Sequence, residues 1–126
     1  MNPHSRDLLE FIYDFRTREA SPALLHAATN RLMDTLGCAL YGGGQEWTQI
    51  LLKTVSNSQG RATAFGGKTM LTAEAAALCN GMAAHGFELD DLLSDALAHP
   101  GAVVVPAVLA VAEEENIGGT DLLKAH

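Results

Sequence analysis

The sequence predicts an all-α fold, a single helical bundle, and three observations support this. Apolar residues recur every three to four positions in several separate segments. Serine, threonine and proline stand where helices begin, and glycines stand where they end. Hydrophobic residues make up 48% of the 126 residues, many of them alanine, so helices can pack closely. We treat residues 1–126 as one domain segment, because this length supports one core.

Two helices are predicted in the first third of the chain. Residues 7–18 form an amphipathic helix whose apolar positions fall on one side, namely Leu8, Leu9, Phe11, Ile12 and Phe15. A second helix begins at Ser21 and Pro22, because serine caps a helix and proline is tolerated in the first turn. It ends at the three glycines of residues 42–44.

The middle of the chain predicts two more helices separated by a loop. A third helix covers residues 46–55. Residues 56–70 are rich in Ser, Gly, Asn and Gln and are predicted as a loop, in which residues 61–65 could be extended. Thr72 caps a fourth helix that runs to about His85. Its alanines and Gly81 make it thin, so we expect it at the centre of the bundle.

The last third predicts an irregular acidic segment and two further helices. Residues 86–101 form the irregular segment. The fifth helix covers about residues 102–115, because Pro106 loses no hydrogen bond within the first four helical positions. Thr120 is expected to cap a sixth helix, which reaches the last residue after six positions. Because so short a helix is not stable alone, we expect the chain to continue in the intact protein.

Composition and charge exclude several classes of partner. The net charge of −7 argues against a nucleic-acid partner and against docking on an anionic membrane. The longest apolar run, residues 101–112, is shorter than the ~20 residues of a membrane span. Residues 1–11 lack the features of a signal peptide, and Cys38 and Cys79 sit in apolar stretches as buried thiols. We therefore expect a cytoplasmic protein.

The chemistry-bearing residues gather in one stretch, residues 80–107. Within 15 positions it holds two histidines and four acids: His85, Glu88, Asp90, Asp91, Asp95 and His99. These acids could be ordinary solvated loop charges. A metal site would need convergent ligands, and His85-x-x-Glu88 completes no known ligand spacing, so no metal is predicted.

Acid–base chemistry needs fewer groups than a metal site, and His99 is the best placed candidate. It directly precedes Pro100, Gly101 and the start of the fifth helix. A helix N-terminus disfavours an imidazolium and attracts an anion. His99 is therefore predicted as a neutral base beside a site for a substrate carboxylate. The other histidines lack such a setting: His4, His26 and His126.

Three blocks in order resemble the 2-methylcitrate dehydratase (MmgE/PrpD) family. The first is the DTLG helix around residues 31–38. The second is Asn80-Gly81, then His85, then residues 88–91, similar to an "NG…H…(D/E)-x-DD" signature. The third is His99-Pro100-Gly101, followed by Pro106 and residues 119–123. The resemblance covers roughly residues 8–126, and it places this chain as the N-terminal portion of the family's helical domain.

The resemblance implies both an activity and site residues. Members include 2-methylcitrate dehydratase, cis-aconitate decarboxylase and iminodisuccinate epimerase; they are cofactor-free, usually homodimeric, and much longer, with a second lid domain. We expect a lyase that acts on a small polycarboxylate by proton transfer next to a carboxylate, within a homo-oligomer. His99 would be the general acid/base and Glu88 a catalytic pocket acid. His85 and Asp91 are assigned to substrate binding. A structural role for Asp90 and Asp91, as caps or arginine partners, is the alternative.

Departures from the family pattern keep other hypotheses open. Leu92 stands where dehydratase-like and decarboxylase-like members often place Thr, and the spacer from Asp91 to His99 is longer. An epimerase of the same family therefore stays possible, as does a non-catalytic helical module that assembles through an apolar face. No Lys or Arg lies between Lys68 and Lys124. Because a polycarboxylate needs cationic partners, we expect this piece alone not to turn over.

Overall fold

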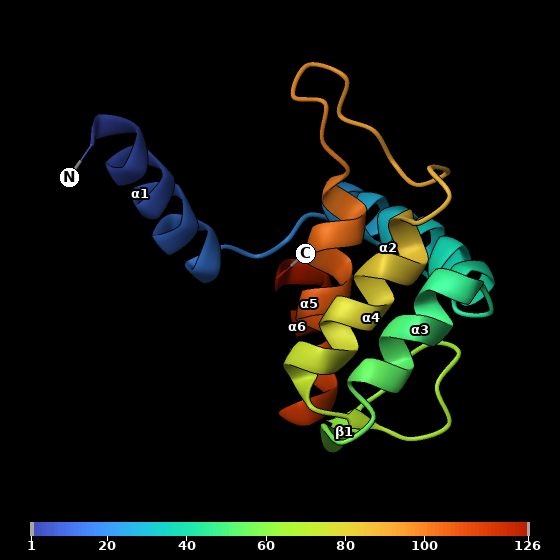
Figure 1. The fold of residues 1–126 in the computed structure, drawn as a ribbon. Coiled ribbons are helices and arrows are strands. Elements are labelled where there is room, and N and C mark those ends of the chain that lie inside the picture. The colour runs from blue at the N-terminus through green and yellow to red at the C-terminus, as the bar shows by residue number, and fades with distance from the viewer. Residues whose placement is uncertain (1, 126) are drawn as a thin grey trace.

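The computed structural model describes residues 2–125, and it confirms the all-α fold. Figure 1 shows a helical bundle with one short strand at its lower end. The elements are α1 (Pro3–Thr17), α2 (Pro22–Gly42), α3 (Glu46–Thr54), β1 (Gln59–Ala62), α4 (Ala73–His85), α5 (Pro100–Glu114) and α6 (Gly119–Ala125). The C-terminal His126 lies outside the described residues.

The fourth helix is the centre of the bundle, as its alanine content predicted. Helix α4 is packed between α2, α3 and α5 (Figure 1). Its buried side chains are small: Ala73, Ala75, Ala76, Cys79, Ala83 and Ala84. Small side chains let the helix axes approach closely. The core is therefore filled mainly by small side chains from neighbouring helices rather than by large apolar ones.

The predicted helix starts at Ser21 and Thr72 are confirmed in detail. Ser21 Oγ accepts a hydrogen bond from the backbone N–H of Leu24 at 3.2 Å. Thr72 Oγ1 accepts one from the N–H of Ala75 at 3.4 Å. Each side chain thereby pairs one of the N–H groups that the first turn of a helix leaves free.

The fifth helix begins two residues earlier than predicted, at Pro100. The fixed φ of Pro100 suits the first helical position, so it starts the helix and leaves Pro106 in the interior. Pro106 has no N–H to donate to the carbonyl of Ala102. That carbonyl oxygen faces α4 at Gly81, where a Cβ atom would lie 3.0 Å from it. The lost hydrogen bond therefore coincides with a close approach of the two helices.

Helix α6 also begins earlier than predicted, at Gly119. The carbonyl of Gly118 accepts the N–H of Leu122 at 3.1 Å, which is the first hydrogen bond of the helix. Thr120 therefore lies inside the first turn, and its assignment as the cap was wrong. Gly118 and Gly119 thus provide the start of the helix.

The loop between α3 and α4 contains the extended segment, but only part of it lies where the sequence placed it. Strand β1 covers Gln59–Ala62 and forms antiparallel bridges with Leu71. The predicted residues 63–65 are instead held by side chains. Asn80 Nδ2 donates to the carbonyl of Thr63 at 2.8 Å, and Asn80 Oδ1 accepts the N–H of Phe65 at 2.8 Å. Asn80 thus replaces a neighbouring strand as the hydrogen-bonding partner.

Helix α1 stands apart from the bundle, joined to α2 by a short extended link (Figure 1). It begins at Pro3, four residues before the predicted start, because Asn2 accepts the N–H of His4 at 3.0 Å as a cap. None of its described residues is buried, and Phe11 is 62% exposed. The predicted amphipathic helix is thus present, but its apolar side is not covered. Among residues 2–125, no helix has the length and hydropathy of a membrane span.

Candidate active site

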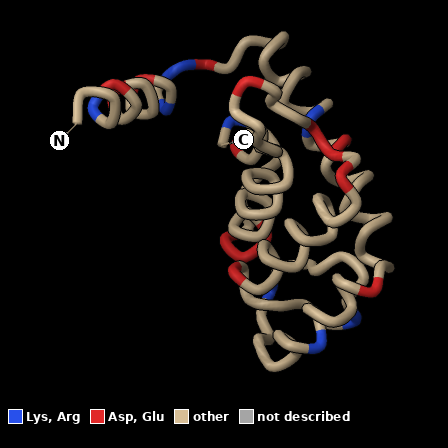
Figure 2. The backbone as a smooth tube through the Cα atoms, turned by 45° about the horizontal axis from the view of Figure 1, so that its top comes forward, with Lys and Arg blue, Asp and Glu red and all other residues tan. Residues whose placement is uncertain are grey.

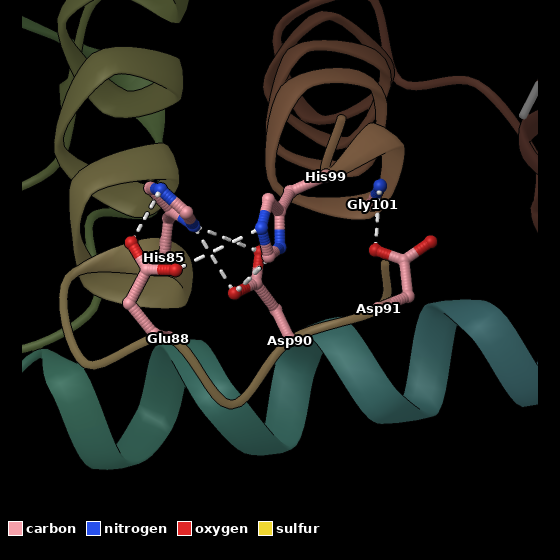
Figure 3. Close-up of polar contacts among 6 residues, drawn as sticks. All are labelled: His85, Glu88, Asp90, Asp91, His99 and Gly101. Carbon is pink, nitrogen blue, oxygen red and sulfur yellow. Dashed lines mark hydrogen bonds and ion pairs between the residues drawn. The ribbon is translucent and has the colours of Figure 1, made fainter. Parts of the chain in front are cut away.

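The irregular segment between α4 and α5 brings two histidines together. His85 is the last residue of α4, and His99 directly precedes α5. Their ring centroids are 4.5 Å apart. Figure 3 shows the two imidazoles facing each other across the segment, with Glu88 and Asp90 reaching toward them. Residues separated by 14 positions in the sequence therefore form one cluster.

Asp90 lies at the buried side of this cluster. Its side chain is fully buried, and Nδ1 of His85 lies 3.2 Å from Oδ1 and 3.3 Å from Oδ2. Nδ1 of His99 lies 3.3 Å from the same Oδ1, but without hydrogen-bond alignment, so this buried nitrogen has no hydrogen-bond partner. One carboxylate therefore faces the Nδ1 atoms of both rings.

Glu88 lies on the opposite, exposed side of the two rings. Its Oε1 is 3.3 Å from Nε2 of His85, and its Oε2 is 3.8 Å from Nε2 of His99. The side chain is 73% exposed, and the backbone is in the left-handed region with φ of 58°. A non-glycine residue rarely adopts this conformation, and such strain is often found at functional sites. We name the four side chains His85, Glu88, Asp90 and His99 the histidine cluster.

Each nitrogen of His85 faces a carboxylate. Nδ1 lies 3.2 Å from Oδ1 of the buried Asp90, and Nε2 lies 3.3 Å from Oε1 of the exposed Glu88 (Figure 3). An ionised carboxylate only accepts hydrogen bonds, so a neutral His85 can donate to one of the two at a time. When the proton is on Nδ1, toward Asp90, the outer nitrogen can accept a proton from a ligand.

Asp91 points away from the histidine cluster. Its Oδ1 accepts the N–H of Gly101, in the first turn of α5, at 2.9 Å. Its Oδ2 lies 3.7 Å from Nη1 of Arg31 on α2. This is the capping and arginine pairing that the sequence left as the alternative to substrate binding. The carboxylate of Asp91 also occupies the helix N-terminus beside His99, where a substrate carboxylate was expected.

The sequence did not predict the positions of Asp90 and Arg31. Glu88 has left-handed backbone and Asp90 is buried on the other side of the two rings, so no alternation along the segment predicts where Asp90 lies. Arg31 lies on α2, far from Asp91 in the sequence, so no local spacing predicts that the two pair. Asp95, which was among the candidates, is exposed and is not one of the residues that contact the two rings.

Charges around the cluster are dominated by acids. The chain has 15 Asp and Glu against 8 Lys and Arg, and Figure 2 shows the cations dispersed along the backbone.

Burial raises the pKa of the Cys38 thiol, and the nearby carboxylates Asp34, Asp90 and Asp91 raise it further. Cys38 and Cys79 are buried free thiols, as predicted.

The N-terminal domain of the MmgE/PrpD family matches residues 6–126 of this chain. The chain belongs to the MmgE/PrpD family. This range includes all four residues of the histidine cluster as well as Asp91.

Two curated proteins are similar to this chain. The cis-aconitate decarboxylase-like protein oryM of Aspergillus oryzae is 27% identical over 114 residues, which is 89% of this chain and 24% of that protein. The cis-aconitate decarboxylase of Aspergillus terreus is 25% identical over 126 residues, which is 94% of this chain and 26% of that enzyme. The chain thus spans about a quarter of the length of the curated relatives it matches.

Proposed function

We propose that this chain carries the proton-transfer part of a cofactor-independent lyase, resembling 2-methylcitrate dehydratase, that acts on a small polycarboxylate. The observation that carries the proposal is the histidine cluster, in which two imidazoles share a buried carboxylate and direct their Nε2 atoms outward. Membership of the MmgE/PrpD family and the likeness to two cis-aconitate decarboxylase-type proteins support the reaction class.

Each residue of the cluster has a role in this proposal. His99 is the general acid/base that moves a proton at the carbon next to a substrate carboxylate. Glu88 is the pocket acid at the open side, where it contacts both Nε2 atoms and orients them. His85 binds the substrate beside His99. Asp90 is a positioning residue, because it faces the inner nitrogens and is buried on the side away from the proposed substrate.

The cluster fits the proton-transfer step that a lyase and an epimerase share. Both Nε2 atoms face the same carboxylate, that of Glu88, so a substrate entering from this side meets both imidazoles from one direction. The likeness to two cis-aconitate decarboxylase-type proteins is the reason for preferring the lyase.

Substrate binding requires cations that the cluster lacks. Arg31 of α2 lies 3.7 Å from Asp91 and is paired with that carboxylate. Because bidentate cationic partners bind carboxylates most strongly, the proposed enzyme uses further residues for this purpose. We therefore propose that residues 1–126 alone do not turn over substrate.

The proposal is tested with the protein expressed from its complete reading frame. Small di- and tricarboxylates, including cis-aconitate, are incubated in D₂O and followed by NMR. Replacing His99 with Gln is expected to lower turnover at least ~100-fold, the scale of a general acid or base. His26→Gln, an exposed histidine on α2, is the matched control and should keep full activity.

Two results would change the assignment. Near-normal turnover of His99→Gln would remove His99 from the acid–base role. Deuterium exchange next to the carboxylate without loss of water or carbon dioxide would favour the epimerase.

A second candidate is a non-catalytic module that assembles through an apolar face, with the chain as a homo-oligomer. The exposed apolar side of α1 favours it, since Leu8 is 58% and Phe11 62% exposed. Apolar patches of this kind mark interaction surfaces. An active enzyme whose turnover does not depend on protein concentration would argue against this candidate.

A further inference from the structure

We propose that His85, Asp90 and His99 also form a binding site for one divalent cation of the zinc class. Ligand atoms of these three residues all lie within 4.8 Å of one another. Imidazole nitrogen and carboxylate oxygen are ligands that zinc prefers, and three protein ligands leave one tetrahedral position for water. The inference goes beyond proton transfer, because it concerns what else these side chains bind.

The spacing of the three ligands suits a tetrahedral ion. Zinc bonds of about 2.0–2.1 Å separate neighbouring ligand atoms by about 3.3–3.4 Å. Nδ1 of His85 and Nδ1 of His99 lie 3.2 Å and 3.3 Å from Oδ1 of Asp90. The third pair, between the two imidazoles, lies within 4.8 Å, so movement of the rings toward each other would complete the tetrahedral spacing.

The unpaired nitrogen of His99 is a second observation that points to a ligand. Nδ1 of His99 is buried and has no hydrogen-bond partner, although it faces Oδ1 of Asp90. Buried polar groups are nearly always paired, so an orphaned one calls for an explanation such as an ion. A cation beside Asp90 would pair both this nitrogen and the buried carboxylate charge.

Glu88 supplies the outer partner that metal-bound histidines usually have. When Nδ1 of each ring binds the ion, the ring proton is on Nε2. The Nε2 atoms of His85 and His99 lie 3.3 Å and 3.8 Å from the carboxylate of Glu88. Acceptance of the outer N–H by a carboxylate fixes the ring orientation and raises the basicity of the ligand nitrogen. No net proton is gained or lost by a neutral His85, because its proton moves from Nδ1 to Nε2.

Metal binding would also regulate the proposed reaction, and this part rests on the proposed function. With the ion on Nδ1 and a proton on Nε2, neither ring can accept a proton from a substrate. An occupied site is therefore inactive, and a chelator restores activity.

Binding is measured on the 126-residue chain by calorimetric titration with ZnCl₂, and by the visible absorption of added Co²⁺. We expect one ion per chain and Co²⁺ bands typical of four-coordinate geometry. Asp90→Asn should weaken binding by more than ~100-fold, beyond the ~10–100-fold effect expected for the outer partner in Glu88→Ala. His26→Gln is the control for loss of an exposed histidine, and its affinity should equal that of the unmodified chain.

The fold of each variant is checked by circular dichroism. If Asp90→Asn loses helix content, His85→Gln carries the test, because His85 is 42% exposed and tolerates replacement better. The inference is overturned if the unmodified chain shows no saturable one-to-one binding, or if His85→Gln binds as tightly as the unmodified chain. The titration needs no substrate, so a failure of metal binding can be distinguished from a failure of the proposed enzymatic activity.

Discussion

Gly42 of α2 lies directly against the backbone carbonyl of Ala83 on α4, so close that a Cβ atom at position 42 would overlap the carbonyl oxygen. This contact holds the two helices close together just before His85, which is the last residue of α4 and belongs to the histidine cluster. The glycine that ends α2 is thus also a point of close packing between the two helices.

Gly42→Ala is therefore expected to destabilise the protein by about 3 kcal/mol, because backbone must move to make room. Gly37→Ala is the matched control in the same helix. No atom lies within 4 Å of a Cβ at position 37, so alanine should stabilise α2 by about 0.5–1 kcal/mol. Urea unfolding measures both changes, and effects of the same sign would contradict the packing described here.

Asn80→Ala is expected to cost about 2–4 kcal/mol of unfolding free energy. The side chain is 1% exposed and pairs the carbonyl of Thr63 and the N–H of Phe65, which alanine would leave buried without partners. Asn30→Ala, on the exposed side of α2, should change stability by less than about 0.5 kcal/mol. Equal effects in urea unfolding would show that the two hydrogen bonds of Asn80 contribute little.

Asp91→Ala is expected to lower stability by about 1–2 kcal/mol through loss of the cap on α5. Arg31→Ala should cost less than about 1 kcal/mol, because the arginine side chain is 63% exposed and its contact with Asp91 is long. Chemical unfolding of both single variants and of the double variant separates the cap from the ion pair. A larger loss for Arg31→Ala than for Asp91→Ala would reverse this assignment.

The buried thiols predict a loss of stability at alkaline pH. Burial raises the pKa of Cys38 and of Cys79 above the ordinary value of 9.0. The folded chain therefore keeps these protons where the unfolded chain releases them, so stability falls as pH rises above 9.0. Urea unfolding at pH 7 and pH 10 should show this fall, and Cys79→Ala should reduce it. Iodoacetamide at pH 8 should label the native thiols much more slowly than the unfolded ones, and equal labelling rates would contradict their burial.

Self-association is expected at high protein concentration, through the uncovered side of α1. Phe11→Asp should shift the molar mass in light scattering toward the monomer, because it places a charge on that side. Leu97→Asp is the control, since Leu97 is 84% exposed in the segment between α4 and α5 and far from α1 in sequence. A monomer at all concentrations for the unmodified chain would exclude this surface as an interface.

The sequence by itself determined the order of the helices and several of their ends. Ser21 and Thr72 begin helices, because capping depends on neighbouring residues alone. Helix α2 ends at Gly42 as predicted, but Gly43 keeps right-handed backbone and forms no left-handed cap. The alanine content of α4 likewise predicted its central position. His99 and Glu88 were chosen from one short stretch, and the structure brings both into one cluster.

Only the tertiary structure decided which side chains meet. The packing of α5 against α4 brings His99 to His85 and places Asp90 beneath both rings. The segment between the helices is irregular, so no periodic pattern predicts this contact. The same packing assigned Asp91 to the N-terminus of α5 and brought Arg31 from α2 beside it. Proline is tolerated in the first turn of a helix, so either Pro100 or Pro106 could lie there. In the structure α5 begins at Pro100, and Pro106 lies in its interior. A sequence pattern reports only which structure each segment favours by itself. Which side chains meet depends on how the segments pack against one another, and only the tertiary structure shows that.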